Sequence, residues 1–255
     1  MDESNNKIYP MSKKIFFVYP VGVVYDLLKD LLKNGYEVYV IKEHQKLIPL
    51  LEKFPSSIVY LNIFEKMNEE EWEEFIKKIL DNENINNIQM GICTYRTNED
   101  EELSTKYLME FGLTGGYINL HINYKKSLEM VLKILEATEA RGRRKYVRAK
   151  PYEEDNNTYI MAEHEGKQTR GKIKDLSVYA FAVEFEKHFF VKNQILRNVL
   201  VKLRGSLINI DFVVKGYHSE NDNIYILIAL IKNDDIKDKI FDYIFERLQT
   251  EIQNC

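Results

Sequence analysis

The sequence predicts two domains of different fold class: an α/β domain, followed by an antiparallel all-β domain that ends in a single helix. In the first half, short apolar runs alternate with stretches that have apolar residues at helical spacing. From Tyr152 onward, strand-like runs follow one another with only polar turns between them. Between the halves lies a basic segment, residues 141–150, in which six of the ten residues are Arg or Lys. We therefore predict domains at residues 1–139 and 151–255, joined by a basic linker at 140–150.

Five strand–helix units are expected in the first domain. The predicted strands are Lys14–Tyr19, Tyr36–Ile41, Ile58–Leu61, Ile88–Cys93 and Tyr117–Leu120. The predicted helices are residues 23–33, 47–54, 69–80, 101–111 and 125–139. This alternation predicts parallel strands with helices on both faces, and right-handed crossovers then favour a doubly wound sheet of flavodoxin-like strand order.

Six strands and one helix are expected in the second domain. The strand-like runs are residues 158–161, 169–173, 180–185, 199–203, 207–214 and 224–229. Closely spaced strands without intervening helices predict an antiparallel barrel or a sandwich. Asp234 to about Ile252 has apolar residues along one face and predicts the closing helix.

Composition limits the compartment and the kind of surface. The net charge of −4, from 36 basic and 40 acidic residues, argues against a surface that binds nucleic acid everywhere, although a local basic patch remains open. Cys93 lies in an apolar run and Cys255 is the last residue, a poor disulfide pair that favours a reducing cytoplasm. The polar start does not resemble a signal peptide, and no apolar run approaches the roughly 20 residues of a membrane span. We expect a cytoplasmic protein without membrane insertion.

Residues suited to catalysis or metal binding are sparse. The five histidines lack the spacing of metal ligands; they are His44, His121, His164, His188 and His218. No phosphate-binding glycine loop is present. We therefore expect no metal and no cofactor, and an enzyme is the least favoured class.

Two polar motifs stand out near the domain boundary. Arg144 and Arg148 are four residues apart, so in an extended or a helical segment both lie on one side, where their planar donor forks could grip a phosphate or a guanine. Asp175 offers two acceptors that suit the N–H edge of guanine, and Ser177 could meet a phosphate or a base. Taken singly, the first motif also fits a solvated linker, and the second fits a turn that satisfies its own backbone.

Taken together, these motifs resemble the PilZ family of cyclic di-GMP receptors. The matches are Arg144-Lys-Tyr-Val-Arg148 and, about thirty residues later, Asp175-Leu-Ser177-Val-Tyr-Ala180. The resemblance covers roughly residues 141–252 and implies a PilZ-like β-barrel with a terminal helix. The site residues that it implies for cyclic di-GMP are Arg143, Arg144, Arg148, Asp175, Ser177 and Ala180. Arg143 supplies the doubled arginine of members that bind an intercalated ligand dimer.

One position departs from the PilZ pattern, because Ala180 stands where the family has glycine. If the backbone there required a positive φ, alanine would be strained and the loop would shift. If glycine serves only close approach, a methyl group would be tolerated.

The first domain resembles a response-regulator receiver in its five units but not in its chemistry. A receiver needs an acidic pair after the first strand to hold Mg²⁺, whereas this sequence has Val18-Tyr-Pro-Val21. Asn62 replaces the phospho-accepting aspartate, and Leu120-His-Ile-Asn123 replaces the segment with the lysine. Thr94 matches the switch hydroxyl. We expect a receiver-like domain that cannot be phosphorylated and that serves partner docking or dimerisation.

These observations favour a bacterial signalling receptor. Cyclic di-GMP would bind at the two motifs, change how the domains are arranged and so control a downstream protein through the first domain. Two alternatives stay open: a nucleic-acid-binding regulator that uses Arg141–Lys150, and a scaffold that binds no ligand.

Overall fold

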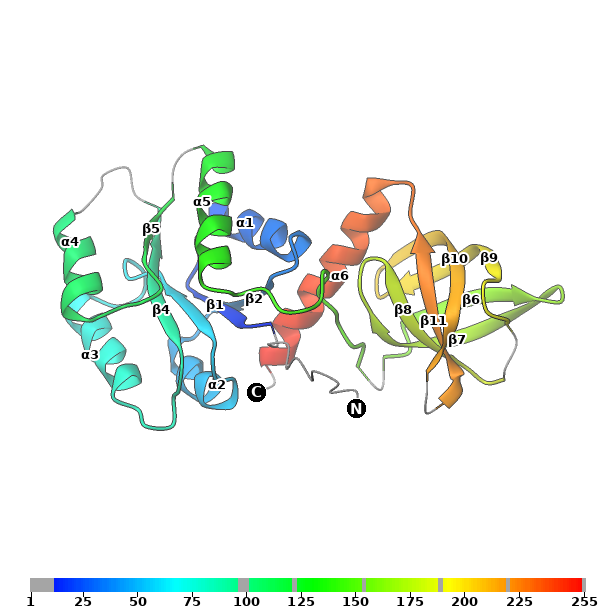
Figure 1. The fold of residues 1–255 in the computed structure, drawn as a ribbon, viewed down its shortest axis with the longest axis horizontal. Coiled ribbons are helices and arrows are strands. Elements are labelled where there is room, and N and C mark those ends of the chain that lie inside the picture. The colour runs from blue at the N-terminus through cyan, green and yellow to red at the C-terminus, as the bar shows by residue number, and fades with distance from the viewer. Residues whose placement is uncertain are drawn as a thin grey trace, which may run out of the picture. The chain divides into compact units, whose positions relative to one another are not determined.

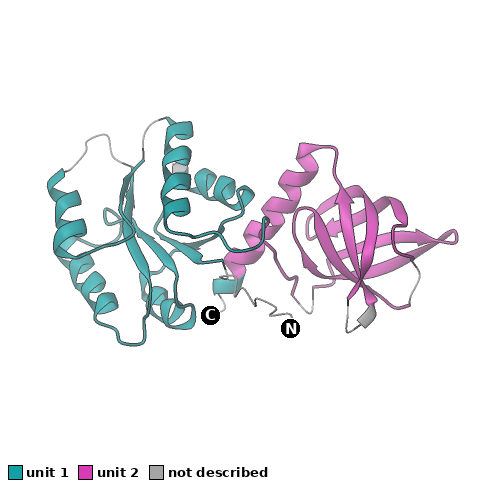
Figure 2. Ribbon diagram, in the orientation of Figure 1, with its two compact units in different colours: residues 1–145, 251–255 teal, residues 146–250 magenta. Residues whose placement is uncertain are grey.

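The computed structural model describes residues 12–95, 101–120, 123–152, 155–187, 190–218 and 221–253. Of the residues discussed above, His121, His188 and Cys255 lie outside these ranges. The contacts divide the chain into two compact units, residues 1–145 with 251–255 and residues 146–250 (Figure 2). The division falls after Lys145, inside the segment predicted as a linker, and it assigns the last five residues to the first unit.

The first unit contains a five-stranded parallel sheet flanked by helices (Figure 1). Its strand order is β2-β1-β3-β4-β5, which confirms the predicted flavodoxin-like order. The elements are β1 (Lys14–Val18), α1 (Gly22–Lys33), β2 (Glu37–Ile41), η1 (His44–Lys46), α2 (Leu47–Lys53), β3 (Ile58–Leu61), α3 (Glu69–Leu80), β4 (Gln89–Thr94), α4 (Glu101–Thr105), η2 (Lys106–Glu110), β5 (Tyr117–Asn119) and α5 (Tyr124–Ala137). The helix predicted over residues 101–111 differs in detail, because its second half, η2, is a π-helix.

Local sequence explains the elements that frame the sheet. Residues 15–18 of β1 are at most 1 % exposed, as expected for a central parallel strand covered on both faces. Gly35 ends the turn after α1 with φ +88°, a conformation that favours glycine. At the start of α3, Asn68 and Glu71 form a capping box, so the helix begins where the chain leaves its turn.

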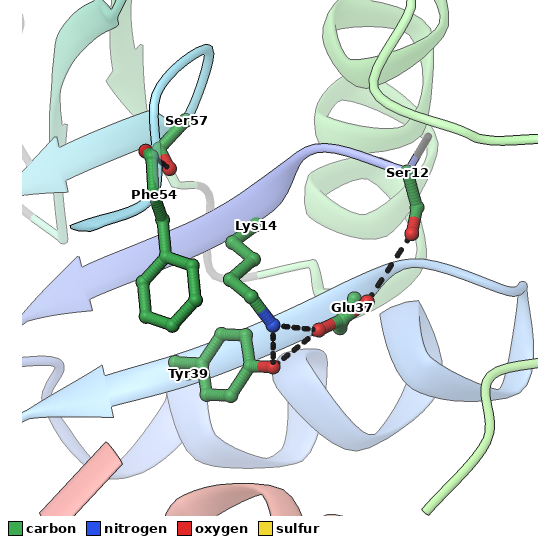
Figure 3. Close-up of polar contacts among 6 residues, drawn as sticks. All are labelled: Ser12, Lys14, Glu37, Tyr39, Phe54 and Ser57. Atoms are coloured by element: carbon green, nitrogen blue, oxygen red, sulfur yellow. Dashed lines mark hydrogen bonds and ion pairs between the residues drawn. The ribbon is translucent and has the colours of Figure 1, made fainter. Parts of the chain in front are cut away.

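A polar cluster ties β1 to β2 at the amino ends of the strands (Figure 3). Lys14 and Glu37 are partners in the parallel register, and their side chains form an ion pair. The Lys14 ammonium also donates to the Tyr39 hydroxyl (2.6 Å) and lies 4.7 Å from the centre of the Phe54 ring. Ser12 donates to the second oxygen of Glu37 (3.2 Å). The charges are therefore paired where the strands enter the sheet.

The second unit is a closed antiparallel barrel followed by a helix (Figure 1). The strand order is β10-β11-β8-β7-β6-β9, which decides between the barrel and the sandwich. The elements are β6 (Thr158–His164), β7 (Lys167–Leu176), β8 (Ala180–Phe185), β9 (Ile195–Leu203), β10 (Ser206–His218), β11 (Asn221–Leu230) and α6 (Asp234–Gln253). The fold class predicted for this half is confirmed, and β10 extends beyond the predicted run 207–214.

The barrel core follows the two-residue alternation of its strands. In β8, Phe181, Val183 and Phe185 are buried while the residues between them are half-exposed. Gly171 in β7 leaves room for the side chains of the paired strand β8, since a Cβ at position 171 would lie 2.5 Å from Val183 Cγ1. Among the described residues, no helix combines the length and the apolar character required to span a membrane.

Candidate functional site

Backbone hydrogen bonds hold the segment that contains Arg148 against the end of β7. The Ala149 N–H donates to the Leu176 carbonyl (2.9 Å), and the Leu176 N–H donates back to the Ala149 carbonyl (3.0 Å). Val147 and Val178, two residues away on either side of this antiparallel bridge, are both buried. Residues 146–149 therefore run along the barrel as ordered chain, and the bridge sets Arg148 beside the Asp175 turn.

Arg148 and Asp175 meet directly. Arg148 Nη1 lies 3.0 Å from Asp175 Oδ2 in a salt bridge, with the arginine side chain 43 % exposed and the aspartate 23 % exposed. The other carboxylate oxygen, Oδ1, is buried and accepts no hydrogen bond. An unpaired buried acceptor is unfavourable, and a donor from a ligand would relieve this cost. The pair thus has one carboxylate oxygen in a salt bridge, one buried carboxylate oxygen without a hydrogen bond, and an accessible guanidinium.

Ser177 and Ala180 close the turn between β7 and β8. The Ala180 N–H donates to Ser177 Oγ (3.2 Å), and the Ser177 N–H donates to the Ala180 carbonyl (2.8 Å). Ser177 is 4 % exposed, so its oxygen serves the turn. The turn is shorter than the stretch between the predicted strands 169–173 and 180–185, because β7 extends to Leu176 and includes Asp175. Ala180 is not among the residues with positive φ, so glycine is not required there.

Two tyrosines that were not predicted as site residues lie at this turn. The rings of Tyr146 and Tyr179 are 5.0 Å apart between centres and tilted by 58°. Lys237, in the first turn of α6, has a raised pKa because it hydrogen-bonds Asp234, and a hydrogen bond to Tyr179 contributes. The signal in the sequence was present, since both tyrosines lie inside the two quoted motifs.

Arg143 and Arg144 are exposed and lie at the end of residues 1–145, the longer of the two segments of the first unit. Arg148, Asp175, Ser177 and Ala180 belong to the second unit. The barrel by itself therefore positions four of the six predicted residues.

The carboxyl edge of the parallel sheet, where a receiver has its acidic site, is built from other groups here. Asn62 follows β3, is buried, and donates from Nδ2 to the Tyr19 carbonyl (3.0 Å). Thr94 at the end of β4 is also buried. Among the described residues, no group of three or more His, Cys, Asp or Glu side chains could hold a metal ion.

Aromatic side chains pack together at the same edge. The Tyr19 hydroxyl lies 2.9 Å from His44 Nδ1, and the centre of the His44 ring lies 5.0 Å from Phe75 and 6.2 Å from Trp72. Burial lowers the pKa of His44, and the Glu71 carboxylate opposes this effect. Trp72 and Phe75 lie in the helix predicted over residues 69–80, but their contacts with Tyr19 and His44 were not predicted.

The fold is thus a doubly wound α/β unit with a five-stranded parallel sheet, joined to a closed six-stranded antiparallel barrel that is followed by a helix. No family model matches the sequence, and no curated protein matches it.

Several solved structures are similar to the chain. The PilZ domain with cyclic di-GMP of YcgR from Escherichia coli is 13% identical over 44% of this chain and 95% of that one, with a TM-score of 0.36. The inhibitor of motility MotI (DgrA) of Bacillus subtilis is 18% identical over 41% of this chain, with a TM-score of 0.33, and the match spans half of its length (50%). A CheY-like receiver domain protein from Methanospirillum hungatei is 20% identical over 51% of this chain and 98% of that one, with a TM-score of 0.37.

Proposed function

We propose that this chain is a receptor for cyclic di-GMP that binds the nucleotide on its second unit. The observation that carries the proposal is the contact between Arg148 and Asp175, two residues that the sequence separates by a strand hairpin and that the Ala149–Leu176 bridge brings together. Both belong to the pair of motifs that resemble the PilZ family.

The chemistry of the pair suits a guanine nucleotide. The buried Asp175 Oδ1 accepts no hydrogen bond within the chain. The N1–H and N2–H₂ groups of guanine are donors that suit a carboxylate. Arg148 uses Nη1 on Asp175 and keeps further donors for a phosphate or the guanine face. In this proposal, Arg143 and Arg144 complete the cationic side of the site, Ser177 holds the turn, and Ala180 lies next to the ligand.

Tyr146 and Tyr179 add a surface for base stacking in this proposal. Each is half-buried and therefore keeps part of its ring accessible. Stacking of a base on an aromatic side chain contributes about 1–3 kcal/mol, without requiring a particular base. Stacking would then supply part of the affinity, and Asp175 the preference for guanine.

The receptor would act as an effector in the bacterial cytoplasm. In this proposal, the bound dianionic ligand favours one arrangement of the two units over another and shifts the population toward it. The first unit, which lacks the receiver's acidic residues, would carry the signal to a downstream protein.

Isothermal titration calorimetry with cyclic di-GMP, cyclic di-AMP and GTP tests the proposal. We expect saturable binding of cyclic di-GMP by the wild type, and no detectable binding when Arg144 and Arg148 are both replaced by Ala. Asp175→Ala should weaken binding roughly 10- to 150-fold, as expected for loss of charge-assisted hydrogen bonds. Arg197→Ala is the matched control, because Arg197 is exposed on β9 of the same barrel and lies outside both motifs.

Two outcomes would contradict the proposal. A wild-type chain without saturable heat for cyclic di-GMP would remove it. Binding of DNA or RNA that weakens steeply with salt and is indifferent to Asp175→Ala would favour the nucleic-acid regulator that uses Arg141–Lys150.

A further inference from the structure

A cavity lies on the barrel, and the motif residues do not line it. It has a volume of about 620 Å³ and is lined by Tyr152, Asp155, Asn157, Arg204 and Gly205. These residues come from the chain before β6 and from the turn between β9 and β10. None of the six residues assigned to the nucleotide site lines it.

Against the Tyr152 side chain of this cavity packs a buried arginine, two of whose guanidinium nitrogens have no hydrogen-bond acceptor. Arg247 of α6 is 8 % exposed, and its guanidinium lies 3.4 Å from the centre of the Tyr152 ring. Its Nε and Nη1 atoms are buried and have no hydrogen-bond partner, and the buried Tyr152 hydroxyl has none either. A ring face attracts a cation but does not replace the acceptors that these N–H groups lose on burial. Nε and Nη1 of Arg247 therefore remain available as donors for an added acceptor.

The carboxylate in the cavity wall does not supply the missing acceptors. Asp155 Oδ1 accepts from the Asn157 N–H (2.9 Å), and Oδ2 accepts from the Thr158 hydroxyl (2.7 Å) with Arg204 Nε at 3.8 Å. Arg204 also lies 5.4 Å from the Tyr152 ring, with its side chain 40 % exposed. Asp155 is thus already engaged, and Nε and Nη1 of Arg247 have no acceptor among the described residues.

We infer that this cavity binds a small oxyanion, a phosphate monoester or a carboxylate, between Arg204 and the Tyr152–Arg247 pair. Guanidinium groups bind such anions through paired N–H donors, and these charge-assisted hydrogen bonds are stronger than those between neutral groups. The anion would accept from Arg204 at the cavity mouth, and a small shift of Tyr152 would open Nη1 of Arg247 to it. This site shares no residue with the proposed nucleotide site and stands independently of it.

Differential scanning calorimetry of the full chain tests the inference, with inorganic phosphate and acetate as probes and chloride at equal ionic strength as the reference. We expect a saturable rise in Tm with phosphate or acetate that chloride does not reproduce. Arg204→Met, at a half-exposed position, should fold as the wild type does and lose the rise. Arg247→Met should also lose it, with a Tm in chloride equal to or above that of the wild type, because removing an unpaired buried charge relieves its desolvation.

A matched variant makes the result specific. Arg197→Met removes an exposed arginine elsewhere on the barrel and should keep the full rise. An equal rise in Arg204→Met and Arg247→Met would overturn the inference. So would a wild type whose Tm rises no more in phosphate or acetate than in chloride.

Discussion

At the scale of single residues, position 180 is where the sequence departs from the PilZ motif, and its backbone conformation decides whether alanine strains the turn. Ala180 replaces a glycine, and the expected harm depended on a positive φ. The backbone there does not have one: Ala180 begins β8 and exchanges hydrogen bonds with Ser177 across the turn. The turn therefore forms with a methyl group in place.

Ala180→Gly tests this interpretation. We expect the free energy of unfolding of the second unit to fall by about 0.5–1 kcal/mol, because glycine in a strand loses more backbone entropy and gains no favourable φ in return. Urea denaturation followed by far-UV circular dichroism would measure the change. A gain in stability would instead indicate that the native backbone strains alanine.

At the scale of elements, the carboxyl edge of the parallel sheet is closed by aromatic packing. The turns after β1 and β2 bring Tyr19 and His44 together, and α3 contributes Trp72 and Phe75. Tyr19 has φ +52°, a conformation uncommon for a bulky residue, and its carbonyl accepts from Asn62. The edge that holds acidic residues in a receiver is thus a packed cluster around a histidine.

This cluster predicts a pH dependence. Burial lowers the pKa of His44 below its ordinary value of 6.5, so the folded unit prefers the neutral imidazole. The resulting stability is complete above the unfolded-state pKa and is lost as the pH falls below it, since the unfolded chain then binds the proton more readily. Tm of the first unit should therefore fall as the pH is lowered from 7 toward 5.

Trp72 is the only tryptophan of the chain and lies in the cluster, so its fluorescence reports this unit. His44→Gln should flatten the dependence of Tm on pH in this range. An unchanged slope in His44→Gln would mean that other groups cause it; His164→Gln, a substitution on the barrel, serves as the control.

At the scale of the whole molecule, the chain has two cores. One lies between the parallel sheet and its helices, and the other fills the closed barrel, where Phe181, Phe212 and Tyr225 are fully buried. A closed barrel has no unpaired sheet edge and carries its own apolar interior.

A fragment of residues 140–255 should therefore fold by itself. We expect a β-rich circular dichroism spectrum, a cooperative thermal transition and retained binding of cyclic di-GMP, because the fragment contains all six proposed ligand residues. The same fragment with Asp175→Ala is the control for binding. An unfolded fragment beside a folded full chain would show that the barrel depends on the first unit.

Much of this architecture could be predicted, because it rests on local patterns. Apolar runs located all five strands of the first unit, and the rule of right-handed crossovers then led to their order. In the second unit, alternation located the six strands but left their closure open. Closure depends on pairing between β9 and β10 and between β9 and β6, whose register no single segment encodes.

The sequence by itself determined the two fold classes, the basic segment and the two motifs, because hydrophobic period and residue spacing are properties of neighbouring positions. Only the tertiary structure decided which side chains meet. Arg148 contacts Asp175 because a backbone bridge joins residues 149 and 176, and Arg247 reaches Tyr152 because α6 returns to the chain segment before β6. Whether a charged side chain is paired or keeps unpaired donors depends on residues that are distant in the sequence. The spacing of residues along the chain does not predict these contacts.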